Sequence, residues 1–224
     1  MGRDPHLVAE AIARAKRQGV SEELLSELDG FTGAVGIWDS GRPGPVTAFR
    51  FDIDCVQVGE TSDPAHEANA GGYASERPNL MHACGHDGHL AVGLGVAQWI
   101  KDHADQLCGK IKLVFQPAEE GTRGARPMAE SGILDDVDFI VCTHIGSSVP
   151  LHQVAVCTHG YLATTKLDIY FEGVPAHAGA NPEKGRSALM AACSAAMMLV
   201  GIPRSGEGDT RIAVGRLTAG EGRN

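Results

Sequence analysis

The residues best suited to chemistry stand in four short clusters, and the densest of them runs from His82 to His89. Within it, Cys84 comes two residues before His86, with a carboxylate and two further histidines beside them. A thiolate and an imidazole are ligands for a transition metal, and Gly85 lets the backbone bend so that both side chains can point to one place. Packed core residues are the alternative, but this density of metal-binding groups favours a metal site.

Two adjacent carboxylates form the second cluster. Glu119 and Glu120 follow an apolar run that ends at Phe115, and Pro117 keeps that predicted strand from continuing. Neighbouring residues in an extended segment point in opposite directions, so one carboxylate can bind a metal while the other acts as general acid and base. Adjacent glutamates are more often simply solvated; their position after a buried strand favours the chemical interpretation here.

Two single histidines and the end of the sequence supply the remaining candidates. His144 follows another apolar strand and is as readily a hydrogen-bonding residue as a metal ligand. His177 lies in a loop of small residues, where it is either an exposed turn histidine or a donor to a tetrahedral oxyanion. Arg223 and Asn224 can grip a carboxylate through their guanidinium and amide groups.

One catalytic zinc ion takes three protein ligands and keeps an open position. The sequence offers four candidate ligands, which is more than one ion needs: Cys84, His86, Glu120 and His144. They fit better as part of a site for two divalent ions, zinc or manganese. Two such ions polarise a carbonyl and activate a water molecule. The sequence therefore predicts metal-assisted hydrolysis, most simply of an amide, with Glu119 passing a proton to the leaving amine.

The elements that must position these residues alternate between strands and helices. Hydrophobic periodicity predicts a pair of surface helices within residues 6–29, helices at 89–103 and 125–131, strands at 34–38, 46–51, 112–115 and 137–142, and a long polar loop at 57–80. This order indicates an α/β fold with a mostly parallel sheet and helices on both faces. Ligands of such sheets collect at the carboxyl ends of the strands, where the clusters lie.

A second, smaller unit is expected after residue 160. Strands are predicted at 166–171 and 211–217, on either side of a helix at 185–200, which gives a β-α-β arrangement.

The composition of the chain excludes some classes of protein and disfavours some classes of binding partner. The chain has 224 residues, 43% of them apolar, which excludes a disordered protein, and a formal net charge of −9, which disfavours nucleic acid and membrane surfaces. Its six cysteines show no C-x-x-C pair, the N-terminus has no secretory pattern, and residues 90–100 are too short to span a bilayer. We expect a cytoplasmic protein with reduced cysteines and a small-molecule substrate.

The clusters together resemble one family. The motifs are residues 82–89, 115–121, His144 and 176–179. In this order they are similar to the motifs of the aminoacylase and carboxypeptidase G superfamily of dinuclear metallopeptidases. Within that superfamily they resemble the amidohydrolase branch, which includes the auxin-conjugate, hippurate and aminobenzoyl-glutamate hydrolases. The stretches 41–45, 120–126, 135–138 and 163–166 resemble most narrowly the A-subunit group of the aminobenzoyl-glutamate hydrolases.

The resemblance implies a role for each candidate residue. Cys84, His86, Glu120 and His144 would be metal ligands, and Glu119 the general acid and base. The remaining roles fall to three residues: His177 would reach the active site of a partner subunit, Asn224 would bind the substrate carboxylate, and Asp54 would orient a metal ligand through a hydrogen bond.

The resemblance also implies an organisation. Residues 1–160 would form a zinc-peptidase-like catalytic domain, and 161–224 the first part of an α+β ferredoxin-like lid and dimerisation domain. Members of the branch are longer and supply a fifth ligand histidine from a C-terminal return, so the chain is expected to be a fragment.

The predicted function is hydrolysis of an N-acyl or N-aroyl amino acid, in particular p-aminobenzoyl-glutamate, by a homodimer or by a heterodimer with a related subunit. The alternative is a truncated, non-catalytic paralogue that binds metal or pairs with a full-length partner.

Overall fold

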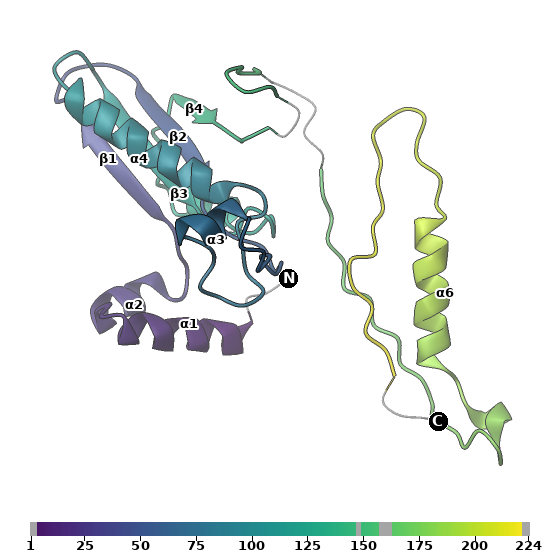
Figure 1. The fold of residues 1–224 in the computed structure, drawn as a ribbon. Coiled ribbons are helices and arrows are strands. Elements are labelled where there is room, and N and C mark those ends of the chain that lie inside the picture. The colour runs from purple at the N-terminus through teal and green to yellow at the C-terminus, as the bar shows by residue number, and fades with distance from the viewer. Residues whose placement is uncertain (1–3, 147–148, 157–162, 221–224) are drawn as a thin grey trace. The chain divides into compact units, whose positions relative to one another are not determined.

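The computed structural model describes residues 4–146, 149–156 and 163–220, and these form two compact units. Unit 1 comprises Met1–Ala155 and unit 2 comprises Val156–Asn224. Figure 1 shows the elements of both units along the chain. The assignment of 1–160 to a catalytic domain and 161–224 to a lid domain stays a prediction.

Unit 1 is built on a sheet of four strands: β1 (Ala34–Asp39), β2 (Val46–Asp52), β3 (Lys110–Gln116) and β4 (Phe139–Cys142). Their order is β1-β3-β2-β4; β2 runs parallel to both β3 and β4, while β1 is antiparallel to β3. The predicted mostly parallel sheet is therefore confirmed. Because β2, β3 and β4 run the same way, their carboxyl ends meet at one edge of the sheet.

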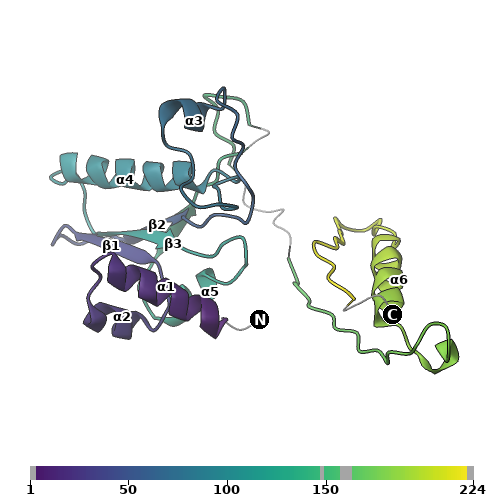
Figure 2. The same ribbon diagram turned by 60° about the horizontal axis from the view of Figure 1, so that its bottom comes forward.

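Helices lie on both sides of this sheet. Figure 2 shows α4 (His86–Asp102) on one face, and α1 (Pro5–Arg17), α2 (Glu22–Leu28) and α5 (Ala125–Glu130) on the other side. Side-chain caps begin the first two helices: the carboxylate of Asp4 accepts from the backbone N–H of His6, and the hydroxyl of Ser21 from that of Leu24. The predicted helix pair within residues 6–29 is confirmed.

The core lies between α4 and the sheet. Ile100 of α4 packs with Phe51 of β2 and with two residues of β3, Ile111 and Leu113. Gly93 lets the helix approach closely, since a Cβ atom there would lie 2.6 Å from a ring carbon of Phe115. This contact packs the middle of α4 against β2 and β3.

The stretch 57–80, predicted to be a polar loop, contains one short helix, α3 (Glu67–Gly71). Five residues are fewer than two helical turns, so hydrophobic periodicity gives no signal for it. Glu60 holds the rest of the stretch in place: its carboxylate lies 3.0 Å from Nε2 of His66 and accepts from the backbone N–H of Ser75 at 2.6 Å.

Unit 2 contains α6 (Ala188–Val200), which confirms the predicted helix, and a 3₁₀ turn at Pro182–Lys184. The strands predicted at 166–171 and 211–217 are wrong, because neither stretch is paired as a strand in the structure. Alternation describes the two faces of a strand, but a strand also needs a hydrogen-bonded neighbour. Among residues 163–220 the isolated bridge between Val174 and Arg186 is the sole β-type pairing.

None of the helices in the described ranges combines the length and the apolar character needed to cross a membrane.

Candidate metal centre

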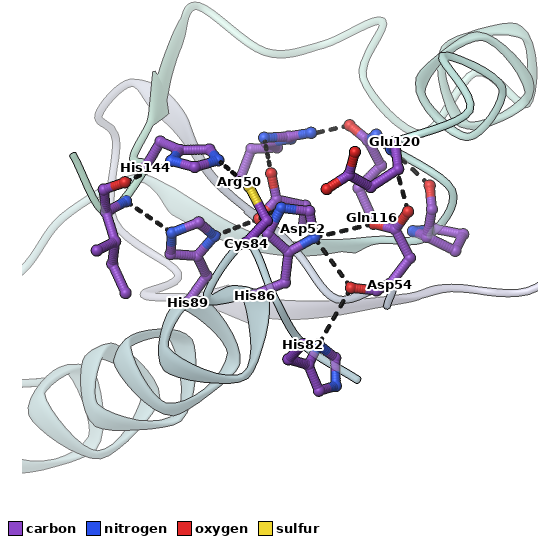
Figure 3. Close-up of polar contacts among 12 residues, drawn as sticks. Arg50, Asp52, Asp54, His82, Cys84, His86, His89, Gln116, Glu120 and His144 are labelled. Atoms are coloured by element: carbon purple, nitrogen blue, oxygen red, sulfur yellow. Dashed lines mark hydrogen bonds and ion pairs between the residues drawn. The ribbon is translucent and has the colours of Figure 1, made fainter. Parts of the chain in front are cut away.

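The candidate site lies where the carboxyl ends of the parallel strands meet the N-terminus of α4 (Figure 3). Asp52 is the last residue of β2 and pairs with Gln116, the last residue of β3, while His144 comes two residues after the end of β4. Gly85 stands directly before α4 in the left-handed conformation, with φ of +80°. That turn, which favours glycine, brings Cys84 and His86 to the same place.

Three of the predicted ligands come together. One nitrogen of His86, the sulfur of Cys84 and one carboxylate oxygen of Glu120 all lie within 4.8 Å of one another. The fourth, His144, is adjacent: its Nε2 lies 3.6 Å from Sγ of Cys84, and its ring centroid lies 5.6 Å from that of His86. The geometry therefore collects one thiol, two imidazoles and one carboxylate.

The tautomer of His86 follows from its neighbours. Its Nδ1 lies 3.0 Å from the backbone carbonyl oxygen of Asp54, which can only accept, so Nδ1 carries the proton. Nε2 therefore presents a lone pair. This atom has no hydrogen-bond partner, and water cannot easily supply one because His86 is only 1% exposed.

His144 is oriented in the same way. Its Nδ1 lies 2.8 Å from the carbonyl oxygen of Ile145, so Nδ1 donates and Nε2 turns its lone pair toward Cys84. Two imidazoles thus direct unprotonated nitrogens into one small region.

Asp54 connects two of the predicted ligands. One oxygen of its carboxylate lies 3.2 Å from Nδ1 of His86, and the other accepts from the backbone N–H of Glu120 at 3.1 Å. A single carboxylate therefore contacts both the ring of His86 and the backbone of Glu120. The role predicted for Asp54, to orient a metal ligand, stays a prediction.

Negative charge accumulates around Cys84. Burial raises the pKa of its thiol, and the carboxylates of Glu120, Glu119 and Asp52 raise it further. A divalent cation reverses this balance, because it stabilises the thiolate and offsets the carboxylates. The donor set and the unpartnered nitrogen of His86 thus fit a divalent transition metal.

A tight turn presents the two glutamates. Ala118 and Thr122 adopt left-handed conformations with φ of +52° and +53°, and the backbone N–H of Gly124 donates to the carbonyl oxygen of Ala118 at 3.1 Å. A Cβ atom at Gly124 would lie 1.5 Å from the carbonyl oxygen of Pro117. Glu119, the predicted general base, is half-buried in this turn and close enough to raise the pKa of the Cys84 thiol.

His177, the predicted oxyanion donor, belongs to unit 2, whereas the residues of the ligand cluster belong to unit 1. Its Nδ1 accepts from the backbone N–H groups of Gly179 and Ala180, each at 3.1 Å. The proton is therefore on Nε2 of an exposed ring, which suits donation to an oxyanion. Arg223 and Asn224 lie outside the described residues.

A buried network beside the ligands was not predicted from the sequence. The carboxylate of Asp52 is fully buried and forms an ion pair with Arg50 at 2.6 Å, and it also contacts Nδ1 of His89. Burial raises the pKa of Asp52, but the hydrogen bond from His89 and the charge of Arg50 more than compensate and hold it below its usual range. The one sequence signal was the spacing of His89 three residues after His86, which puts both on one helix face.

The family model described as Peptidase family M20/M25/M40 matches residues 48–213. An A-subunit homolog of p-aminobenzoyl-glutamate hydrolase, from Haemophilus influenzae, is 51% identical over 223 residues, which cover 100% of this chain and 53% of that protein. Indole-3-acetyl-aspartic acid hydrolase of Enterobacter agglomerans is 50% identical, with 99% of this chain and 51% of that protein covered.

A solved structure gives the same picture. The crystal structure of an aminobenzoyl-glutamate utilization protein from Klebsiella pneumoniae superposes with a TM-score of 0.66 at 42% identity, covering 100% of this chain and 50% of that one. The chain spans about half the length of the curated relatives it matches.

Proposed function

Because the chain belongs to peptidase family M20/M25/M40, we propose that it is a metal-dependent amidohydrolase acting on N-acyl or N-aroyl amino acids. One observation carries the proposal: ligand atoms of Cys84, His86 and Glu120 lie within 4.8 Å of one another, around a buried His86 nitrogen that has no hydrogen-bond partner. That arrangement directs an unused lone pair at a place where a cation can bind it.

Cys84, His86, Glu120 and His144 would hold two divalent ions, zinc or manganese. When bound, such ions polarise a substrate carbonyl and lower the pKa of a water molecule. Asp54 keeps the ring of His86 in the tautomer that offers Nε2.

Glu119 moves the proton. Its carboxylate takes a proton from the attacking water and delivers it to the nitrogen of the leaving amine, so that the amine departs neutral. The Nε2–H group of His177 donates to the oxyanion that forms on the former carbonyl oxygen, in the active site of a partner subunit. Arg223 and Asn224 would bind the substrate carboxylate.

Two relatives that are about 50% identical to this chain support a substrate class. p-Aminobenzoyl-glutamate and indole-3-acetyl-aspartic acid differ in their aromatic acyl group, but both join it through an amide to an acidic amino acid. We infer that the chain acts on this class, with p-aminobenzoyl-glutamate as its substrate. Arg223 is the residue suited to a second carboxylate.

Assembly and location complete the proposal. Two of the relatives are named as one subunit of a hydrolase, which supports a dimer, either of two copies or with a related subunit. Cys55, Cys84, Cys108, Cys142 and Cys193 form no disulfide in the structure, which supports a reducing, cytoplasmic location.

A second candidate function is metal binding without catalysis, or pairing of a truncated paralogue with a full-length partner. The observation in its favour is that the ligand atoms of Cys84, His86 and Glu120 lie within 4.8 Å of one another, which is sufficient for metal binding without a catalytic base. Under this alternative the ligand cluster still binds metal, but Glu119 has no catalytic use.

The test is release of p-aminobenzoate from p-aminobenzoyl-glutamate by the full chain, with manganese or zinc added after chelator treatment. We expect Glu119→Gln to lower the rate about 10²- to 10⁴-fold, the usual contribution of a general base. Glu27→Gln is the matched control, since Glu27 is an exposed residue of α2 on the opposite side of the sheet from α4.

Three outcomes separate the candidates. Metal-dependent release that Glu119→Gln abolishes supports the enzyme, and comparison with indole-3-acetyl-aspartate and N-acetyl-glutamate then defines the acyl group. Stoichiometric metal binding without release supports the second candidate. Absence of both metal binding and release overturns the proposed function.

A further inference from the structure

We propose that His89 is a positioning residue that holds the segment after β4, and with it His144, over the metal centre. The inference rests on the proposed function, because His144 is one of the proposed ligands. It assigns a role to a buried histidine that the reaction itself does not use.

Both ring nitrogens of His89 are engaged. Nε2 lies 2.7 Å from the backbone nitrogen of Ile145, which can only donate, so Nε2 accepts and the proton is on Nδ1. Nδ1 in turn donates to a carboxylate oxygen of Asp52. The ring therefore forms a bridge from the end of β2 to the segment that follows β4.

The contact with Ile145 acts directly on His144. The N–H group that His89 accepts from belongs to the peptide unit joining His144 to Ile145. The carbonyl oxygen of Ile145 accepts from Nδ1 of His144 at 2.8 Å and so sets the tautomer of that ring. Fixing Ile145 thus fixes both the place and the proton of the proposed ligand.

The other end of the bridge is firmly held. Asp52 is 0% exposed, and its second carboxylate oxygen accepts from Nη1 of Arg50 at 2.6 Å. Nε of Arg50 donates to the side-chain oxygen of Gln116 at 2.9 Å, and this bond connects Arg50 to the last residue of β3. A hydrogen-bonded chain therefore runs from β3 through β2 and α4 to Ile145, and the guanidinium of Arg50 favours the ionised form of Asp52, which accepts from His89.

Packing supports the same contact. The side chain of Ile145 lies over two glycines of the α4 N-terminus: a Cβ atom would come within 2.7 Å of its Cδ1 at Gly88 and within 3.4 Å at Gly85. The missing side chains let Ile145 approach α4 closely enough for its N–H to reach His89.

This geometry also decides between two roles for His89. One ligand atom each of Asp52, His86, His89 and His144 lies within 4.8 Å of the others, so a second metal-binding group is conceivable on distance alone. A metal ligand needs an unused lone pair, however, and that of His89 is directed at the Ile145 N–H. The structure assigns His89 to positioning instead.

Two substitutions separate the two contacts. In His89→Gln the amide oxygen can reach the place of Nε2 and accept from Ile145, whereas in His89→Asn the shorter amide can reach Asp52 but leaves Ile145 without an acceptor. His103→Asn, at the other end of α4, is the control. Each full-length variant is titrated with Co²⁺, whose absorption spectrum reports thiolate and imidazole ligation, and the unfolding temperature of the metal-free chain is measured alongside.

We expect His89→Asn to weaken Co²⁺ binding about 10- to 100-fold, the usual effect of losing a partner that orients a ligand. His89→Gln should stay much closer to the wild type, and His103→Asn should equal it. Equal affinities for both His89 variants overturn the inference. So does a loss of affinity in His89→Asn that is matched by a proportionate fall in the metal-free unfolding temperature. A wild-type chain that gives no cobalt–thiolate absorption overturns the proposed metal centre itself, which is a distinct result.

Discussion

Gly93 offers a sharp test of how closely α4 must approach the sheet. A Cβ atom at this position would lie 2.6 Å from Cε1 of Phe115 and 2.9 Å from Cδ2 of Phe51. Neither ring can easily retreat, because Phe51 is 1% exposed and the two ring centroids are 5.7 Å apart. Gly95, two residues further along the same helix, has no atom within 4 Å of its own ideal Cβ and is the matched control.

Gly93→Ala and Gly95→Ala share the gain in helix propensity, but only Gly93→Ala introduces a steric clash with the core. Alanine in place of glycine inside a helix stabilises by about 1 kcal/mol, so Gly95→Ala should raise the free energy of unfolding by that amount. Gly93→Ala gains the same term but overpacks the core, at a cost of about 1–3 kcal/mol. We therefore expect Gly93→Ala to unfold about 1–3 kcal/mol more easily than Gly95→Ala.

The assay is urea unfolding followed by tryptophan fluorescence. Both tryptophans of the chain, Trp38 and Trp99, belong to unit 1, so the signal reports the unit that contains α4. A Gly93→Ala midpoint equal to or above that of Gly95→Ala would refute the reasoning, because it would mean that the helix can move away from the sheet at no cost.

Three further predictions concern the site and its surroundings. Asp54→Ala should weaken zinc binding about 10- to 100-fold in a competition titration, because it removes the acceptor shared by two proposed ligands. Gly124→Ala should lower both the urea midpoint and metal affinity, since its Cβ atom would clash with the carbonyl oxygen of Pro117. The hydrogen bond from Lys112 lowers the pKa of Asp136 in the folded protein. The wild-type chain should therefore have a higher urea midpoint than Asp136→Asn at pH values above the unfolded-state pKa of about 4. This difference should disappear as the pH falls through the lower, folded-state pKa.

Each of these has its own contradicting result. Unchanged zinc affinity in Asp54→Ala would show that the ligands keep their places without this carboxylate. A Gly124→Ala protein with normal stability would show that the turn can relax. A midpoint difference for Asp136→Asn that grows on acidification would have the wrong sign for a lowered pKa.

Local patterns predicted the elements of unit 1 apart from the short α3, because hydrophobic periodicity is a property of each segment by itself. Apolar spacing predicted a helix at 89–103, and α4 covers His86–Asp102; the run at 112–115 lies inside β3, Lys110–Gln116. The order of the strands is not local. That β3 lies between β1 and β2 depends on contacts between residues some 60 to 80 positions apart along the chain.

The same limit explains the errors in unit 2. Residues 166–171 alternate as a strand should, yet Leu167 is 75% exposed and Ile169 is 56% exposed. Alternation shows that a segment could cover a core, whereas strand formation depends on a neighbour that donates and accepts hydrogen bonds. Within the described part of unit 2, α6 forms because a helix makes its backbone hydrogen bonds within one segment and needs no neighbouring strand.

At the candidate site, residue types indicated the ligands but not what holds them. The spacing in residues 82–89 identified Cys84 and His86 because two ligands two residues apart are a local pattern. Asp52 contacts Arg50 of its own strand and His89 of α4, and Arg50 in turn contacts Gln116 of β3. Nothing in the sequence near Arg50 or His89 indicates that they meet. These partners became visible only from the fold.

The end of β2 and the residues just after it therefore orient three of the four proposed ligands through two aspartates that need not touch a metal. Asp54 orients His86 and the backbone of Glu120, while Asp52 acts through His89 on the segment that carries His144. An ionised carboxylate is costly to bury, and Asp52 is buried completely; its ion pair with Arg50 offsets that cost. Asp52 on β2, the strand between β3 and β4, and Asp54 two residues beyond it thus place the two carboxylates where they reach proposed ligands from α4 and from the segments that follow β3 and β4.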